Sequence, residues 1–158
     1  MLNAATGELG YCLKGMKSRM IQIDLFGEED FAYDLPNKTQ SESEKILVNF
    51  HPNKNGKEEI LKLYDLWKEQ KIRMVKSPGG SPAWAILESA KGDFIYINKW
   101  TGAAAKSYDL AAAHLIIEGA GGFILDRDLN PIPETGHKGI FLTGVSLELI
   151  KSFLKQFL

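Results

Sequence analysis

The sequence predicts an α/β protein, a layered mixed β-sheet flanked by helices, with an N-terminal antiparallel hairpin beside it. From Lys45 onward, short apolar runs alternate with amphipathic stretches at close spacing, which is typical of α/β layers. Before Lys45, two runs rich in β-forming residues stand outside this alternation. The chain has 158 residues, 44% of them hydrophobic, so it can bury a sizeable core.

The hairpin is predicted from residues 8–14 and 18–25, which a short turn around Gly15 separates. Residues 27–44 are polar and irregular, so we expect them to connect two structural layers. The predicted domains are a remnant hairpin with its linker (1–44) and a C-terminal α/β domain (45–158). An isolated hairpin is marginally stable in water, so this one has to pair with something else.

Hydrophobic periodicity divides the α/β domain into strands and helices. The predicted strands are 45–50, 72–75, 94–97, 123–125 and 139–143. The first predicted helix opens at an Asn55–Glu58 capping box and has Ile60, Leu63, Tyr64 and Trp67 on one face. The other predicted helices span residues 82–90, 109–120 and 146–157. The helix over 109–120 is apolar nearly all round, which indicates that it is buried.

Charge and composition exclude several classes of protein. The chain has 19 Lys+Arg against 20 Asp+Glu. A protein that binds a nucleic-acid polymer or an anionic membrane would be expected to have an excess of basic residues. One cysteine, Cys12, excludes an internal disulfide framework, and we interpret it as a small strand residue. No apolar run is long enough to span a membrane, and the first residues do not resemble a signal peptide, so we expect a cytoplasmic protein.

Two local features could carry chemistry. The run from Ser77 to Pro82 joins a strand to a helix, and its glycines would let backbone N–H groups approach a phosphate. It could equally be a β–α turn that binds nothing. Asp109 begins an apolar helix, where a carboxylate either complements the helix dipole or offers an oxygen ligand to Mg²⁺.

Other polar groups predict no site. The acidic run from Gly27 to Asp30 is typical of solvated surface. His51, His114 and His137 are scattered and lack metal-ligand spacing.

Three stretches together resemble the inositol monophosphatase family, a family of Mg²⁺-dependent, lithium-sensitive phosphatases. They are Gly80-Ser81, the run from Tyr108 to Ala113, and the run from Ile117 to Gly122, with supporting likeness in residues 5–11 and 14–15. Tyr108 stands where the family signature has tryptophan, and Gly119 where it has alanine. The resemblance covers essentially the whole chain as one C-terminal portion, and it implies a truncated form of the family's sugar phosphatase fold.

The resemblance implies roles for four residues. Asp109 matches an aspartate that ligates the catalytic Mg²⁺, while Gly79, Gly80 and Ser81 match the loop that contacts the substrate near its phosphate. The family acts on inositol phosphates, sugar phosphates and nucleotide bisphosphates, so a phosphorylated small molecule is the implied partner.

The chain also departs from the family pattern. It has no Asp-Pro-x-Asp-Gly-Thr motif, which supplies most metal ligands in the family, and Gly27-Glu28-Glu29 follows the hairpin instead of preceding it. An expected acidic substrate contact has no match among residues 100–105. Because one carboxylate rarely holds Mg²⁺ tightly, we expect weak or absent metal binding by this chain alone.

Two functions therefore stay open. The chain is the C-terminal part of a Mg²⁺-dependent phosphomonoester hydrolase, inactive alone, or it is a non-catalytic phosphate-ligand-binding or interaction module derived from that family. Exposed strand edges favour a homo-oligomer or pairing with a missing N-terminal segment.

Overall fold

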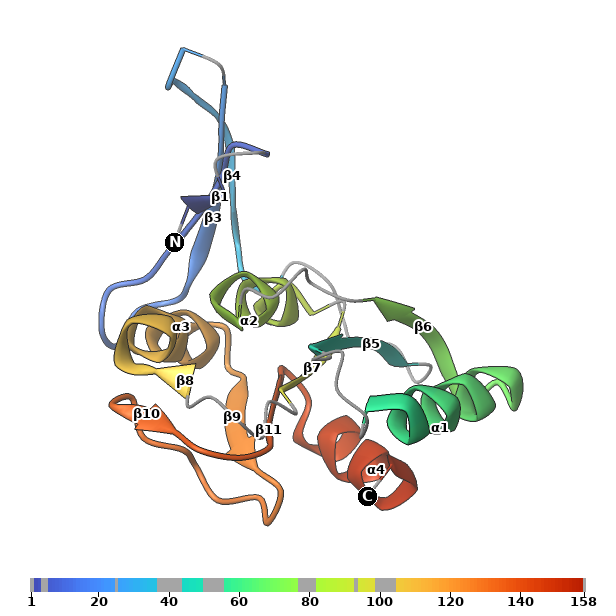
Figure 1. Cartoon of the computed structure of the whole chain (residues 1–158). Helices are drawn as coiled ribbons and strands as arrows, with labels where there is room; N and C mark the ends of the chain where they lie inside the picture. The colour runs from blue at the N-terminus through green and yellow to red at the C-terminus, as the bar shows by residue number, and fades with distance from the viewer. Residues whose placement is uncertain are drawn as a thin grey trace.

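The computed structural model describes residues 2–3, 6–24, 26–36, 44–49, 56–76, 82–92, 94–98 and 105–157. Its centre is a mixed five-stranded sheet with the order β6-β5-β7-β11-β9 (Figure 1). The strands are β5 (Glu44–Asn49), β6 (Ile72–Lys76), β7 (Ile95–Asn98), β9 (Phe123–Asp126) and β11 (Phe141–Gly144). β5 pairs in parallel with β6 and β7, while β11 pairs antiparallel with β7 and β9. The predicted mixed α/β sheet is confirmed.

Four helices are described, and they cover the two faces of this sheet (Figure 1). They are α1 (Gly56–Lys68), α2 (Pro82–Ala90), α3 (Ser107–Gly119) and α4 (Leu147–Phe157). Alternate residues of β7 point to opposite faces: Tyr96 packs in one core with α2 and α3, and Ile97 packs in another with α1 and α4. Because both faces are covered, the strand is apolar along most of its length instead of alternating with polar residues.

The helix ends follow local sequence rules. α2 begins at Pro82, where proline at the first helical position loses no hydrogen bond. Ser146 precedes α4, and its Oγ accepts the Leu149 N–H at 3.3 Å. After α3, Gly121 takes a φ of 71°, which lets the Gly122 N–H reach the Ile117 carbonyl at 2.8 Å.

The predicted N-terminal hairpin belongs to a four-stranded antiparallel sheet with the order β1-β2-β3-β4. Its strands are β1 (Leu2–Asn3), β2 (Glu8–Tyr11), β3 (Arg19–Ile23) and β4 (Glu29–Asp34). The predicted irregular connection over 27–44 is therefore wrong at β4. The acidic residues of β4 are not typical of a strand, so the sequence pattern did not predict one. They lie on an exposed edge of the sheet, where Phe31 and Tyr33 pair with residues of β3.

The N-terminal sheet packs on α2 and α3 (Figure 1). Met20 and Leu35 are 1% and 2% exposed in the core that these helices share. The Ser18 N–H donates to the Gly119 carbonyl at 3.0 Å, and the Ser18 hydroxyl donates to the Ile116 carbonyl at 2.6 Å. The division at residue 44 stays a prediction, while the core itself is continuous across the two segments.

Side-chain burial differs from the prediction in α1. Leu63 and Leu66 are the buried residues, whereas Tyr64 and Trp67 are about half exposed and contact each other with ring centroids 5.6 Å apart. Helix α3 is not buried all round either, because Ala111, Ala112 and Glu118 form an exposed stripe. In both helices, the neighbouring elements cover only one side.

A small pair of strands, β8 (Ala105–Lys106) and β10 (Gly136–His137), joins the start of α3 to the loop before β11. These two-residue strands are too short for periodicity to predict. Within the part of the chain that the structure describes, no helix has the length and apolar character needed to cross a membrane.

Candidate functional site

The strand order places a candidate site at one edge of the five-stranded sheet. β5, β6 and β7 are parallel, so their carboxyl ends at Asn49, Lys76 and Asn98 share that edge. The chain leaves β5 through α1 on one face and leaves β6 through α2 on the other. In such open sheets, ligands bind in the crevice where the connections diverge to opposite faces. We call this edge the carboxyl edge.

Two helices begin at the carboxyl edge. α2 follows β6 and leads back to the start of β7, so its N-terminus at Pro82 lies there. β9 runs in the same direction as β7, because both strands are antiparallel to β11. α3 leads to the first residue of β9, which lies at the edge of the sheet opposite the carboxyl edge. α3 therefore also begins at the carboxyl edge, and the free N–H groups of two helix N-termini favour an anion.

The predicted metal ligand, Asp109, is the third residue of α3. Its backbone therefore lies in the first turn of the helix, at the carboxyl edge. The predicted substrate-binding residues Gly79, Gly80 and Ser81 lie outside the described residues, directly before Pro82. The topology thus brings Pro82, at the start of α2, and Ser107, at the start of α3, to one edge of the sheet. The role of each predicted residue stays a prediction.

Asn98 is a candidate that the sequence reasoning missed. It ends β7, is 2% exposed, and lies beside Asn49 in the register of β5 and β7. Its side-chain Oδ1 accepts no hydrogen bond from the residues that the structure describes. A buried acceptor without a donor costs free energy, so it calls for a ligand group or water. The signal in the sequence was a polar residue closing the apolar run Ile95-Tyr96-Ile97.

The packing between α2 and α3 holds the two N-termini together. Small residues, Ala85 and Ala113 among them, are 0% exposed in the shared core, which lets the helices approach closely. The Ser89 hydroxyl lies 2.9 Å from the Phe94 carbonyl and 2.8 Å from the Thr143 carbonyl, tying α2 to β11 of the sheet. The edge is therefore built on rigid elements.

Lys91 and His114, two of the groups with shifted pKa values, lie away from the carboxyl edge. Burial by itself lowers the pKa of Lys91, but hydrogen bonds from its ammonium to Glu8 and Glu88 outweigh burial and raise it. Burial lowers the pKa of His114, and the carboxylates of Glu118 and Glu134 only partly oppose it. These shifts concern the packing of α2 and α3.

The donor set does not fit a Mg²⁺ ion on the described residues alone. No three His, Cys, Asp or Glu side chains in the described ranges come together as a metal site would require. Mg²⁺ keeps an octahedral shell of oxygen ligands, which one aspartate does not provide. The acidic run from Gly27 to Asp30 is exposed, as predicted for solvated surface.

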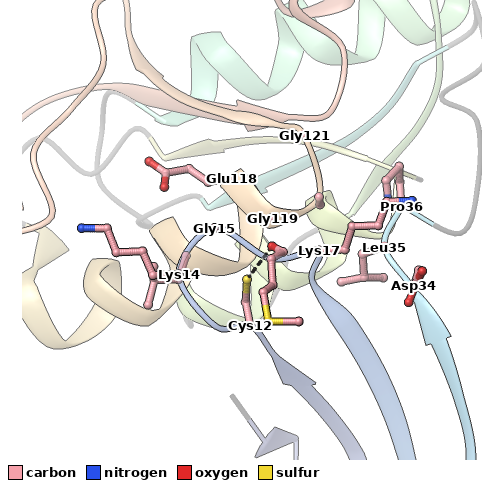
Figure 2. A pocket seen from close by; sticks show the side chains of 13 residues that line it. Cys12, Lys14, Gly15, Lys17, Asp34, Leu35, Pro36, Glu118, Gly119 and Gly121 are labelled. Atoms are coloured by element: carbon pink, nitrogen blue, oxygen red, sulfur yellow. Dashed lines mark hydrogen bonds between the residues drawn. The ribbon is translucent and has the colours of Figure 1, made fainter.

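A pocket of about 550 Å³ lies at the opposite end of α3 (Figure 2). Its wall includes the C-terminal turn of α3 at residues 118–121, which is ~15 Å from Asp109 at 1.5 Å per helical residue. Cys12 also lines it, one residue beyond the end of β2, so the prediction of a strand residue is wrong. The Cys12 thiol donates to the Met16 carbonyl at 3.3 Å.

Comparison with solved structures identifies the fold. The chain superposes on the inositol monophosphatase from Anabaena (Nostoc) sp. PCC 7120 with a TM-score of 0.63 and 14% identity, covering 94% of this chain and 53% of that one. For Mycobacterium tuberculosis SuhB the TM-score is 0.64 with 16% identity, covering 98% and 55%. For an inositol monophosphatase from Zymomonas mobilis it is 0.62 with 21% identity, covering 95% and 53%.

The chain therefore has the fold of inositol monophosphatases and spans about half the length of these structures. This confirms, at the level of fold, the resemblance drawn from the Tyr108–Ala113 and Ile117–Gly122 motifs. No family sequence model matches the chain, and no curated protein matches it in sequence.

Proposed function

We propose that this chain binds the phosphate of a small phosphorylated molecule at the carboxyl edge and forms the C-terminal part of a phosphomonoester hydrolase. One observation carries the proposal: strand order and helix direction bring the N-termini of α2 and α3 to the same edge, where Asn98 offers an unpartnered acceptor among the described residues. The fold shared with inositol monophosphatases supports a phosphorylated polyol or sugar as the substrate class.

Each part of the edge has a distinct role in this proposal. The N–H groups that begin α2 and α3 hold the phosphate oxygens. Gly79, Gly80 and Ser81, which directly precede α2 in the sequence, keep the substrate-binding role that the sequence resemblance implies. Asn98 accepts a hydrogen bond from a hydroxyl of the substrate body, and Asp109 is the one metal-ligand candidate that the sequence resemblance assigns to the chain.

Hydrolysis requires more than these residues. Because the described donor set does not fit Mg²⁺, we propose that the remaining ligands come from another polypeptide segment or another subunit, and that this chain alone binds without turnover. The same donor set favours the second candidate, a phosphate-ligand-binding module without catalysis.

The test combines binding and turnover on the purified chain. Inositol 1-phosphate, a sugar bisphosphate and 3′-phosphoadenosine 5′-phosphate are titrated by NMR and assayed for phosphate release, with and without Mg²⁺. Asp109→Asn is the site variant, and Asp65→Asn, on the exposed side of α1, is the control. We expect saturable shifts around residues 82–84, 98 and 107–110 without phosphate release.

Two other outcomes are informative. Mg²⁺-dependent release that Asp109→Asn abolishes and Asp65→Asn preserves would show that the chain assembles a complete site. Folded protein without saturable shifts at the carboxyl edge for any of the three probes would contradict the proposal.

A further inference from the structure

The pocket at the C-terminal end of α3 has a mainly apolar wall (Figure 2). Three segments supply the wall: the loop 12–17, residues 34–36 after β4, and residues 115–121 at the end of α3. Its apolar members are Cys12, Met16, Leu35, Pro36, Leu115 and Ala120. Met16 is 60% exposed, so part of this apolar surface faces solvent. An open apolar pocket is typical of a surface that receives an apolar group from a partner.

The charged residues around the pocket carry an excess of positive charge. Figure 2 shows Lys14 and Lys17 on opposite sides of it, and no ion pair within the described residues involves either lysine. Asp34 is paired with Arg19, with its Oδ1 3.3 Å from Nε, which leaves Glu118 as the other acid of the wall. An acidic partner with an apolar anchor would therefore match the pocket in both polarity and charge.

The turn between β3 and β4 has both of these properties. We call this turn, Asp24 and residues 26–30, the tip. Phe26 is 91% exposed there, more than any other large hydrophobic side chain in the described part of the chain. Three exposed acids follow it, Glu28, Glu29 and Asp30. Burial of so exposed an aromatic ring in a partner would favour association.

Hydrogen bonds hold the tip in one shape. The Asp24 carboxylate accepts the Phe26 and Glu28 N–H groups, each at 2.8 Å. The Asp24 N–H donates to the Glu28 carbonyl at 2.9 Å, and Gly27 supplies the φ of 85° within the turn. A preorganised turn loses less conformational entropy on binding than a flexible loop does, which favours Phe26 as an anchor.

The tip lies too far from the pocket of its own chain to fill it. The loop 12–17 precedes β3 and the tip follows β3, so the tip and the pocket are at opposite ends of this strand. The five residues of β3 alone separate them by roughly 16 Å in an extended strand. Figure 1 shows the β3–β4 hairpin extending away from the helices. A tip that fills the pocket must therefore come from a second copy of the chain.

We propose that copies of this chain associate head to tail, with Phe26 of one copy buried in the pocket of the next. Lys14 and Lys17 attract the acidic tip from either side of the pocket and need no shared contact. Because the tip and the pocket are different surfaces, each bound copy keeps one of them free, and assembly continues into a chain or closes into a ring. The interface lies at the end of α3 opposite Asp109 and does not depend on the proposed phosphatase function.

The test uses two variants that each lack one half of the contact. Phe26→Ser removes the anchor and keeps the pocket, whereas Met16→Glu places an acid in the pocket and keeps the tip. Both side chains are exposed, so we expect both variants to fold. Tyr64→Ser, which removes a half-exposed aromatic from α1, is the matched control. In sedimentation velocity, wild type and Tyr64→Ser should assemble beyond the dimer as concentration rises, and each half variant should associate at least about tenfold more weakly.

An equimolar mixture of the two half variants separates this contact from other modes of association. Phe26→Ser supplies an intact pocket and Met16→Glu an intact tip, so the mixture should form a heterodimer that grows no further. Reversing both lysines in one chain, Lys14→Glu with Lys17→Glu, should weaken association by about five- to tenfold.

Several results would overturn the proposal. They are a monomeric wild type, a mixture that stays monomeric or grows beyond the dimer, and association that the lysine reversals leave unchanged. Assembly through the exposed edge of β4 or the outer face of the N-terminal sheet would survive Phe26→Ser, so undiminished assembly of that variant would also overturn it.

Discussion

At Gly119, the last turn of α3 comes so close to the loop between β2 and β3 that no side chain fits. A Cβ there would lie 2.7 Å from the Met16 carbonyl oxygen, and closer still to Ser18 Oγ and Cys12 Sγ. The position is thus a point of backbone contact between two layers. The sequence shows only that glycine replaces an alanine of the family signature here, and the structure supplies the reason.

Gly119→Ala should destabilise the protein by about 1–3 kcal/mol, because relieving the overlap has to move α3 away from Ser18. The sign is informative, since glycine-to-alanine changes inside helices normally stabilise by about 1 kcal/mol. Urea denaturation measures the free energy of unfolding. Ala112→Ser, on the exposed stripe of the same helix, is the control. A Gly119→Ala variant that is as stable as wild type would contradict the contact.

Asn98→Leu should weaken binding of inositol 1-phosphate by up to about tenfold, because it removes the acceptor proposed to hold a substrate hydroxyl. The free energy of unfolding should change by less than about 1 kcal/mol, since a buried unpartnered oxygen is also removed. Thr143→Val is the matched control: Thr143 is 0% exposed, and its Oγ1 has no partner in the described part of the chain. Equal losses of binding in both variants would contradict a specific role for Asn98.

Among the elements, β2 and α2 are joined by a buried ion-pair triad. Lys91 follows the end of α2, and its ammonium contacts the carboxylates of Glu8 on β2 and Glu88 on α2. All three side chains are largely buried, with 11%, 21% and 12% exposure for Lys91, Glu8 and Glu88. Removing the cation leaves two desolvated carboxylates, which costs more than an exposed pair would.

Lys91→Met should therefore destabilise the protein by about 3 kcal/mol at pH 7, measured by urea denaturation. Lys71→Met removes an exposed pair and should cost less than about 1 kcal/mol. A Lys91→Met variant that loses no more stability than Lys71→Met would show that the triad contributes little.

The same triad predicts a pH dependence. Burial by itself raises the pKa of Glu8, but the contacts with Lys91 and Thr6 lower it below its ordinary value of 4.5. Its contribution to stability is therefore present above pH 4.5 and is lost as pH falls through the lowered pKa. In wild type this should appear as a loss of stability in that acid range. The loss should shrink in Glu8→Gln, and an identical acid profile in that variant would contradict the assignment.

For the whole molecule, the outer face of the N-terminal sheet has no covering layer among the described residues. Leu9, Ile21 and Ile23 are half-buried on this face. Phe26, between β3 and β4, is 91% exposed, and Phe31, on the other face of the edge strand beside Tyr33, is 53% exposed. Exposed strands and aromatic side chains favour association. Oligomerisation and a cytoplasmic location both remain predictions.

We expect the purified chain to form a dimer or larger assembly at micromolar concentration, measured by light scattering after size-exclusion chromatography. Phe31→Lys, which places a charge on the edge strand β4, should shift the population towards the monomer. Tyr64→Lys, on the exposed side of α1, is the control. A wild-type chain that stays monomeric across the accessible concentration range would contradict this expectation.

The sequence by itself determined the α/β class, most helices and strands after residue 44, and the place of Asp109 at a helix start. These follow from periodicity, capping and proline placement, which act over a few residues. It failed at β4, whose acidic residues resemble a loop until β3 pairs with them. It also failed at Tyr64 and Trp67, because the residues that a helix buries depend on its neighbours.

Only the tertiary structure determined which residues, distant in the sequence, lie close together in space. The meeting of the α2 and α3 N-termini with Asn98 depends on the strand order β6-β5-β7-β11-β9, which no local pattern contains. The pocket with Lys14 and Lys17 depends on α3 docking against a loop about 100 positions earlier in the chain, through hydrogen bonds such as Ser18 to Ile116. Local residue preferences specify elements, whereas sites arise from contacts between segments distant in sequence, and those contacts form only when the layers pack.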